Sequence, residues 1–145
     1  MADWIRDAVR RIDGGHVVPR FAVVPGLSGA GGTLWIGDGA TVQGGLRHGG
    51  AIVAGRGVRV LGPVHGGHEV VLGAACHVHG PVEAEGRVVV QHGAVVEGPL
   101  RAGGDVLLLG EARVGDVEAG GDVLVAGAPH TGRLRPGGRV MTRAW

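Results

Sequence analysis

The sequence predicts an all-β fold, a single-stranded triangular β-helix (solenoid) of about six to seven coils of 18 residues each. Two observations predict this fold. A frame of 18 residues repeats without a gap through residues 22–111, and inside each repeat the apolar residues recur in pairs two positions apart. Glycine supplies 32 of the 145 residues, a content that would indicate disorder in a chain without a repeat.

The repeats cover residues 22–39, 40–57, 58–75, 76–93 and 94–111; residues 112–128 fit with one deletion, and 129–145 form a degraded seventh repeat. Alternate side chains of a strand share a face, so apolar pairs at positions 1 and 3, 7 and 9, and 13 and 15 predict three short inward-facing strands per coil. One coil cannot bury its own apolar face, which is why the repeat must recur. Two columns are wholly apolar: Val24, Val42, Val60, Val78, Val96 and Val114 at the third position, and Leu34, Ile52, Val70, Val88, Val106 and Val123 at the thirteenth.

Residues 1–21 are expected to form a separate N-terminal helix and linker before a β-helix domain of residues 22–145. Trp4, Ile5, Val9 and Ile12 fall on one stripe of a helix, and Gly14 follows as a stop signal. The segment therefore predicts a short amphipathic helix. Its three arginines are balanced by three aspartates, so it lacks the cationic surplus that favours anionic lipid.

The fourteenth position of each repeat lies between two inward positions and is therefore predicted to face outward, yet it is apolar throughout. An apolar row of this length needs a cover, which could be the N-terminal helix, a second protomer or a membrane. The neighbouring twelfth position is charged, which disfavours immersion in lipid. We favour docking of the N-terminal helix, with a membrane or partner surface as its alternative. This row, here called the outward ladder, consists of Trp35, Val53, Val71, Val89, Leu107 and Leu124.

The repeat pattern V-x-G-x-[VL]-x-A-x-x-x-V-x-[VL], seen in VHGPVEAEGRVVV and VEGPLRAGGDVLL, resembles the bactofilins, bacterial polymer-forming cytoskeletal proteins. The resemblance covers residues 40–128, with a weaker extension back to residue 22. It implies a right-handed β-helix, because the period alone does not determine the hand. It also implies nucleotide-independent filaments, often near a membrane, that scaffold cell-shape or wall machinery. The implied partners are further copies of the chain or another bactofilin-like protein.

Two other classes of protein remain open. Left-handed β-helix acyltransferases and γ-type carbonic anhydrases also have 18 residues per coil, but such enzymes usually add a long loop or C-terminal helix to build the site, and this sequence shows neither. A monomeric adaptor could instead bind a partner helix on the outward ladder. Filaments, zinc-bound trimers and monomers would distinguish the three classes.

Composition excludes much chemistry. The sequence has no lysine and a single serine, Ser28, which removes lysine-based catalysis and most serine nucleophiles. The glycine-rich stretch GLSGAGG at residues 26–32 lacks the GK[ST] ending of a phosphate loop, and a net charge of +1 argues against general attraction to nucleic acid. We expect no catalytic residue, no cofactor, no nucleotide and no specific nucleic acid. A lone Cys76 and the lack of a signal peptide favour the cytoplasm, with membrane association through the N-terminal helix as an option.

The histidines are the residues that most suggest an enzymatic site. His77 and His79 are predicted to point outward from one strand, with Glu97 one coil further on, so a surface metal site is conceivable. Polar decoration of a solvated face is the interpretation we favour for them, and for His65 and His68, which straddle a corner. His48 falls in an inward column and is expected at an expanded or shifted corner.

The C-terminal end is predicted to be an interface, because a solenoid exposes unpaired strand edges at its last coil. Residues 129–145 contain no acidic side chain, so two such ends would repel each other. We expect this end to pair with an acidic partner, or with itself only when salt screens the charges, with apolar contact from Met141 and Trp145. The cationic residues are Arg133, Arg135, Arg139 and Arg143.

Overall fold

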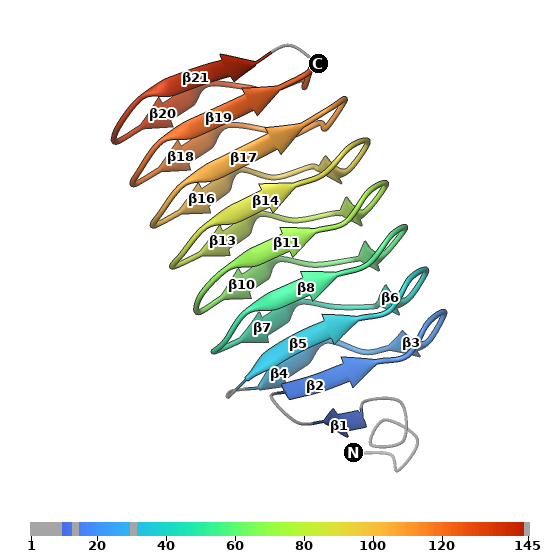
Figure 1. Cartoon of the computed structure of the whole chain (residues 1–145). Helices are drawn as coiled ribbons and strands as arrows, with labels where there is room; N and C mark the ends of the chain where they lie inside the picture. Colours follow the sequence, from blue (N-terminus) through green and yellow to red (C-terminus); the bar gives the residue numbers. More distant parts are fainter. Residues whose placement is uncertain (1–9, 13–14, 30–31, 144–145) are drawn as a thin grey trace.

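The computed structural model describes residues 10–12, 15–29 and 32–143, and these form a rod of stacked coils (Figure 1). The described residues are all strand, turn or irregular backbone, and they contain no helix that is long and apolar enough to cross a membrane. The β-solenoid of repeating coils that the sequence predicts is confirmed.

Three sheets form the sides of the rod, and successive coils add parallel strands to each sheet, although the third side lacks regular strands in the last coils. The nine-stranded sheet is ordered β1 (Arg10–Ile12), β2 (Gly15–Val18), β5 (Thr33–Ile36), β8 (Ile52–Ala54), β11 (Val70–Leu72), β14 (Val88–Val90), β17 (Val106–Leu109), β19 (Val123–Ala126) and β21 (Val140–Arg143).

The seven-stranded sheet is ordered β20 (Leu134–Pro136), β18 (Val117–Ala119), β16 (Leu100–Ala102), β13 (Val82–Ala84), β10 (Val64–Gly66), β7 (Leu46–His48) and β4 (Leu27–Gly29). The five-stranded sheet is ordered β15 (Val95–Val96), β12 (His77–Val78), β9 (Arg59–Val60), β6 (Thr41–Val42) and β3 (Val23–Val24). Isolated bridges from Val95 to Arg113 and on to His130 continue this third side.

The coils wind in a right-handed sense. In Figure 1 the chain runs from left to right along a front strand such as β5, returns behind through β6 and β7, and rises toward the C terminus with each coil. This is the hand that the bactofilin resemblance implies, and it is the usual hand of connections between parallel strands. It differs from the left-handed coils of the acyltransferase and carbonic anhydrase class.

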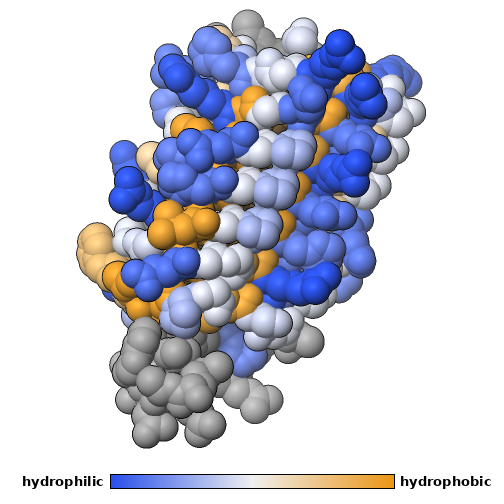
Figure 2. All heavy atoms as spheres, turned by 180° about the vertical axis from the view of Figure 1, so that it is seen from behind, coloured by the Kyte–Doolittle hydropathy of each residue, from blue (hydrophilic) through white to orange (hydrophobic). Residues whose placement is uncertain are grey.

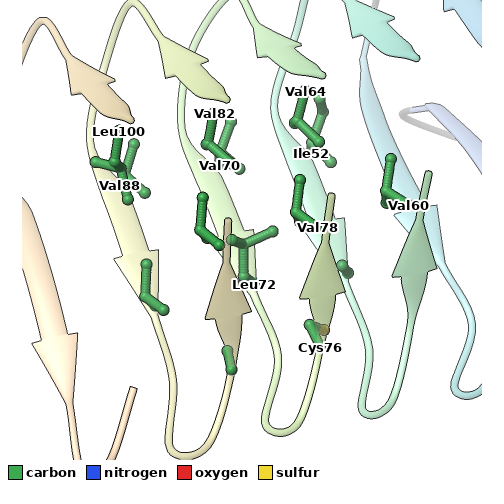
Figure 3. Packing of buried hydrophobic residues seen from close by; sticks show 14 of the residues in the cluster. Ile52, Val60, Val64, Val70, Leu72, Cys76, Val78, Val82, Val88 and Leu100 are labelled. Carbon is green, nitrogen blue, oxygen red and sulfur yellow. The ribbon is translucent and has the colours of Figure 1, made fainter. Parts of the chain in front are cut away.

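The alternation of apolar and polar residues sets the inward and outward faces. Strands of three residues such as β11 and β13 bury their first and third side chains, while the middle side chain faces solvent. Figure 3 shows the buried residues meeting across the interior, where Val70 of the nine-stranded sheet lies beside Val82 of the seven-stranded sheet. Each such side chain also stacks on the equivalent residue of the next coil, because the pairing keeps the repeat in register.

A left-handed turn follows the nine-stranded sheet in every coil. Glycine supplies this conformation at most of these turns, for example Gly57 with φ +68°, whereas Ala75 adopts it with φ +58°. Glycine, which has no side chain, adopts the left-handed backbone conformation at little cost, whereas alanine adopts it under strain. The turn explains five of the 32 glycines, and many of the others lie where a Cβ would meet the backbone of the preceding coil, as at Gly67 and Gly73.

Aspartate side chains bind successive coils together where the corners leave backbone donors free. Asp105 Oδ1 accepts a hydrogen bond of 2.8 Å from the backbone N–H of Asp122, and Asp122 Oδ1 accepts one of 2.8 Å from Arg139. Asp38 and Asp116 accept equivalent bonds from the coil that follows each of them. These aspartates therefore have structural partners in the stack.

The N-terminal prediction is wrong at residues 10–12. These residues form β1, which pairs antiparallel with β2, whereas the sequence predicted that a helix extends to Ile12. The apolar stripe of a short segment fits a helix and an edge strand alike, and the unpaired edge of β2 supplies hydrogen-bond partners that favour the strand. The remaining residues of the expected stripe, Trp4, Ile5 and Val9, lie outside the described residues.

The solenoid also begins before the predicted boundary at residue 22. β2 pairs in parallel with β5, so residues 15–18 already belong to the first coil. A shift of one residue follows: Leu27, and not Ser28, pairs with the inward Leu46. The glycine-rich stretch at residues 26–32 thus carries the strand β4, whose pairing with β7 shows the shift.

Candidate functional site

The outward ladder lies where the sequence placed it, on the solvent side of the nine-stranded sheet. Parallel pairing aligns its members coil by coil, so that Val71 lies opposite Val53 on one side and Val89 on the other. Trp35 is exposed at 37% of its surface, and the valines and leucines of the row are partly exposed. The six side chains therefore form one continuous apolar row along the rod.

The structure lengthens the row at both ends. Val17 pairs with Trp35, and Met141 pairs with Leu124. Sequence reasoning missed Val17, because the repeat frame was started at residue 22, and it assigned Met141 to the C-terminal end alone. Extending the frame one coil in each direction from Trp35 and Leu124 would have found both residues. The outward ladder thus has eight members in register.

Charged residues line one side of the outward ladder, and two of them form an ion pair. Arg87 Nη2 lies 2.9 Å from Glu69 Oε2, and these residues directly precede the buried valines of β14 and β11. An exposed ion pair contributes little to the free energy of folding, but it holds its two side chains in place beside the apolar row. An apolar row with charged flanks suits a protein interface, whose centre is dry and whose rim is polar.

The opposite side of the rod has a different character. Figure 2, which views the molecule from behind, shows many hydrophilic residues, narrow hydrophobic bands between them, and a broader hydrophobic patch toward the N-terminal end. Exposed apolar residues of the early coils include Phe21 and Val23, at 76% and 49% of their surfaces. A hollow of about 430 Å³ on the seven-stranded sheet is crossed by an ion pair, in which Arg101 Nε lies 3.4 Å from Glu118 Oε2. Prolines and charged side chains line this hollow, so it is an open groove on a charged sheet and does not enclose a substrate as a typical ligand pocket does.

The C-terminal end is an open edge among the residues that the structure describes. β21 is the last strand of the nine-stranded sheet and β20 the last of the seven-stranded sheet, and no further described strand pairs with them. Val140 and Met141 are exposed at 44% and 42% of their surfaces. Arg133, Arg135 and Arg139 are exposed beside them, Arg143 lies in β21, and Trp145 lies outside the described residues.

The two ends of the rod therefore differ. β1 covers the outer edge of β2 at the N-terminal end, whereas the outer edge of β21 has no such cover within the described chain. An uncovered edge with apolar and cationic side chains is a surface that another chain can pair with.

Two of the histidines that the sequence singled out, His77 and His79, lie close together in the structure. His77, His79 and Glu97 lie at one corner of the five-stranded sheet, and one ligand atom from each falls within 4.8 Å of the others. His65 has a single acidic neighbour, with Nδ1 lying 3.9 Å from Glu83 Oε2. His68 is exposed and is not part of a group of this kind in the described residues.

His48 occupies a regular strand and not the expanded corner that the sequence predicted. Its side chain is 3% exposed, and Nε2 lies 2.9 Å from the carbonyl oxygen of Gly32. The paired residues one coil before and after it are Gly29 and Gly66, which leave the space that the imidazole fills. His48 is thus a hydrogen-bonded core residue.

Fold and surfaces together define a right-handed β-solenoid with an apolar outward ladder and, within the described residues, an open C-terminal edge. Comparison with known proteins adds no name to this class: no family model, no curated protein and no solved structure matches the chain.

Proposed function

We propose that the chain is a bactofilin-like structural protein that assembles, with itself or with a related β-solenoid, into nucleotide-independent cytoskeletal polymers or scaffolds in the cytoplasm. The single observation that carries the proposal is the outward ladder, which runs in register along the nine-stranded sheet from Val17 to Met141.

A second copy of the chain is the occupant that fits the outward ladder best. A straight row of eight apolar side chains, spaced by about 4.8 Å, matches the same row on another rod lying alongside it. Full burial of a valine or leucine side chain stabilises by about 1.5–3 kcal/mol, and the ladder residues still expose part of that area. The cumulative gain favours lateral pairing of two rods.

The open C-terminal edge supports growth along the rod axis. β20 and β21 present unpaired backbone groups, and Val140 and Met141 add apolar contacts beside them. A lateral contact and an axial contact on one rod are the two elements that a filament or sheet requires.

The winding and the grooves support a structural role over an enzymatic one. The right-handed coil differs from that of the β-helix acyltransferases and carbonic anhydrases. Two of the charged side chains that border the hollow of about 430 Å³, Arg101 and Glu118, are paired with one another across coils, and Asp116 there accepts a backbone hydrogen bond from Arg133. No catalytic role is proposed for any residue.

Electron microscopy and sedimentation of the purified full chain, without nucleotide or metal, test the proposal. We expect polymers or extended assemblies of the wild type. Val71→Asp and Val89→Asp should each reduce the assembly size without unfolding the coils, because they place charge within the apolar row. Val95→Asp is the matched control: it also changes a half-buried outward valine, but on the five-stranded sheet.

Four outcomes would contradict the proposal. A wild type that remains monomeric at all concentrations points to the adaptor class, and strict dependence on a nucleotide points away from bactofilin-like assembly. Equal effects of Val89→Asp and Val95→Asp would show that the outward ladder is not the lateral interface. Binding of the wild type to anionic vesicles without self-assembly would assign the ladder or the N-terminal segment to a membrane.

A further inference from the structure

The corner formed by β12 and the residues after it brings together three side chains with metal-binding atoms. His77 belongs to β12, His79 follows this strand, and Glu97 occupies the position of His79 in the next coil. The two imidazole rings stack, with centroids 4.1 Å apart and planes inclined by 4°.

The carboxylate of Glu97 faces both rings. Its Oε1 lies 3.3 Å from His77 Nε2, and its Oε2 lies 2.9 Å from His79 Nδ1. Two ligand atoms bound to one tetrahedral zinc ion, each at about 2.0–2.1 Å, lie about 3.3 Å apart. The spacing of each nitrogen from the carboxylate is therefore close to what a shared metal ion requires, and all the ligand atoms lie within 4.8 Å of one another.

His77 Nε2 supplies an independent observation. This atom is buried and has no hydrogen-bond partner among the described residues, because its approach to Glu97 lacks the geometry of a hydrogen bond. A buried polar atom without a partner is costly and needs an explanation. A metal ion bound to this nitrogen would satisfy it.

We propose that His77, His79 and Glu97 bind a divalent transition-metal ion of the Zn²⁺ type. Two imidazoles and one carboxylate suit Zn²⁺, Ni²⁺, Co²⁺ and Cu²⁺, whereas Mg²⁺ and Ca²⁺ prefer oxygen ligands only. Three protein ligands leave a position for water or for a ligand from outside the chain.

Metal binding must break the ring stack. A metal ion lies near the plane of each imidazole that it binds, and two planes inclined by only 4° and set apart by stacking do not share such a point. One ring must therefore rotate, and the partly exposed position of both histidines leaves room for it. Arg59 and Leu61 of the preceding coil and Val95 of the next coil border the rings, and Arg59 is the one cation among these three.

Two titrations of the tag-free protein test the proposal. One uses Zn²⁺ and is measured by calorimetry, and the other uses Co²⁺ and is measured by visible absorption. We expect one ion per chain and at least a tenfold loss of affinity in His79→Gln and in Glu97→Gln. The imidazole proton resonances of His77 and His79 should shift together on addition of Zn²⁺, as the stack opens. All three side chains lie outside the apolar core, so the variants should unfold at the temperature of the wild type.

His65→Gln is the matched control, since His65 also has a glutamate one coil further on but lacks a second histidine. Its Zn²⁺ affinity should equal that of the wild type. The proposal is overturned if the wild type binds no better than His79→Gln, or if His65→Gln weakens binding as much as Glu97→Gln does. The ligands belong to one chain, so this result stands apart from whether the protein polymerises.

Discussion

The thiol of Cys76 donates a hydrogen bond of 2.9 Å to the carbonyl oxygen of Gly55, one coil earlier. Its side chain is 1% exposed, and this burial raises the pKa of the Cys76 thiol above its ordinary value. The negative charge of Asp38 acts in the same direction, while backbone hydrogen bonds from Val58, Gly73 and Gly57 oppose it. The folded chain therefore holds a proton that the unfolded chain releases more easily.

This difference predicts that stability falls at alkaline pH. The unfolded thiol has a pKa of about 8.5, and below that pH the thiol is protonated in both states, so the folded state keeps its full stability. As pH rises from there toward the higher pKa of the folded state, the unfolded chain loses its proton first and the free energy of unfolding falls. The loss per pH unit approaches about 1.4 kcal/mol within that window. Urea unfolding between pH 7 and pH 10.5 measures it.

The composition leaves few other groups that titrate at alkaline pH. The chain contains no lysine and no tyrosine, so above about pH 8.5, beyond the ordinary range of imidazole, the α-amino group is the other group that still titrates. Cys76→Ala should give a profile that is nearly flat above pH 8.5. A profile of the wild type that matches that of Cys76→Ala would show that the thiol does not cause the change.

The left-handed turns give a prediction about backbone strain. A Cβ added at Gly57 would meet no atom within 4 Å, so Gly57→Ala changes only the conformational preference of a residue with φ +68°. We expect the free energy of unfolding to fall by about 1 kcal/mol. Ala75→Gly, at the equivalent turn, should raise it by less than that, because glycine also gains entropy in the unfolded chain.

Denaturant unfolding of the two variants decides this prediction. If Gly57→Ala were as stable as the wild type, the positive φ at this column would carry no strain, and the glycines there would need another explanation.

Adjacent residues of β15 separate the core from the surface. Val96 is 2% exposed and points inward, whereas Val95 is half-buried and points outward. Val96→Asp should lower the free energy of unfolding by several kcal/mol or prevent folding, because the buried carboxylate has no polar partner in the stack. Val95→Asp should change it by about 1 kcal/mol or less, as judged by urea unfolding. Similar losses in both variants would contradict the assignment of the two faces.

The fold could be predicted from the sequence because its signal repeats. A single pair such as Val88 and Val90 fits a strand or a buried helix, but the same pair recurring in each coil fits only stacked strands. The outward ladder followed from the same frame, since the residue between two inward positions must point out.

The remainder depended on information that the period does not contain. The β1 strand forms because β2 offers an unpaired edge, and this edge exists only in the assembled sheet. The local apolar pattern around Ile12 therefore could not predict the strand. The space around His48 depends on Gly29, which reaches that place through a one-residue shift of the first coil. The sequence placed His77, His79 and Glu97 on one face, but the stacking of the rings depends on side-chain rotamers.

The last prediction concerns the open C-terminal edge. Arg133, Arg135 and Arg139 are exposed there, residues 129–145 contain no acidic side chain, and the aspartates nearest in the stack already accept backbone hydrogen bonds. Two such ends in contact would bring like charges together across the seam, which costs free energy unless salt screens it.

We therefore expect assembly of the wild type through this end to increase with ionic strength, since the Debye length falls from about 30 Å at 0.01 M salt to about 8 Å at 0.15 M. The double variant Arg133→Glu, Arg139→Glu should pair with the wild type at low salt, because the ends then carry opposite charges. Sedimentation of the two proteins, alone and mixed, across a salt series measures both effects. Arg47→Glu, Arg59→Glu is the matched control, since these arginines are exposed on the seven-stranded and five-stranded sheets away from the end. Assembly that is independent of salt and equal in all mixtures would show that the cationic end takes no part in it.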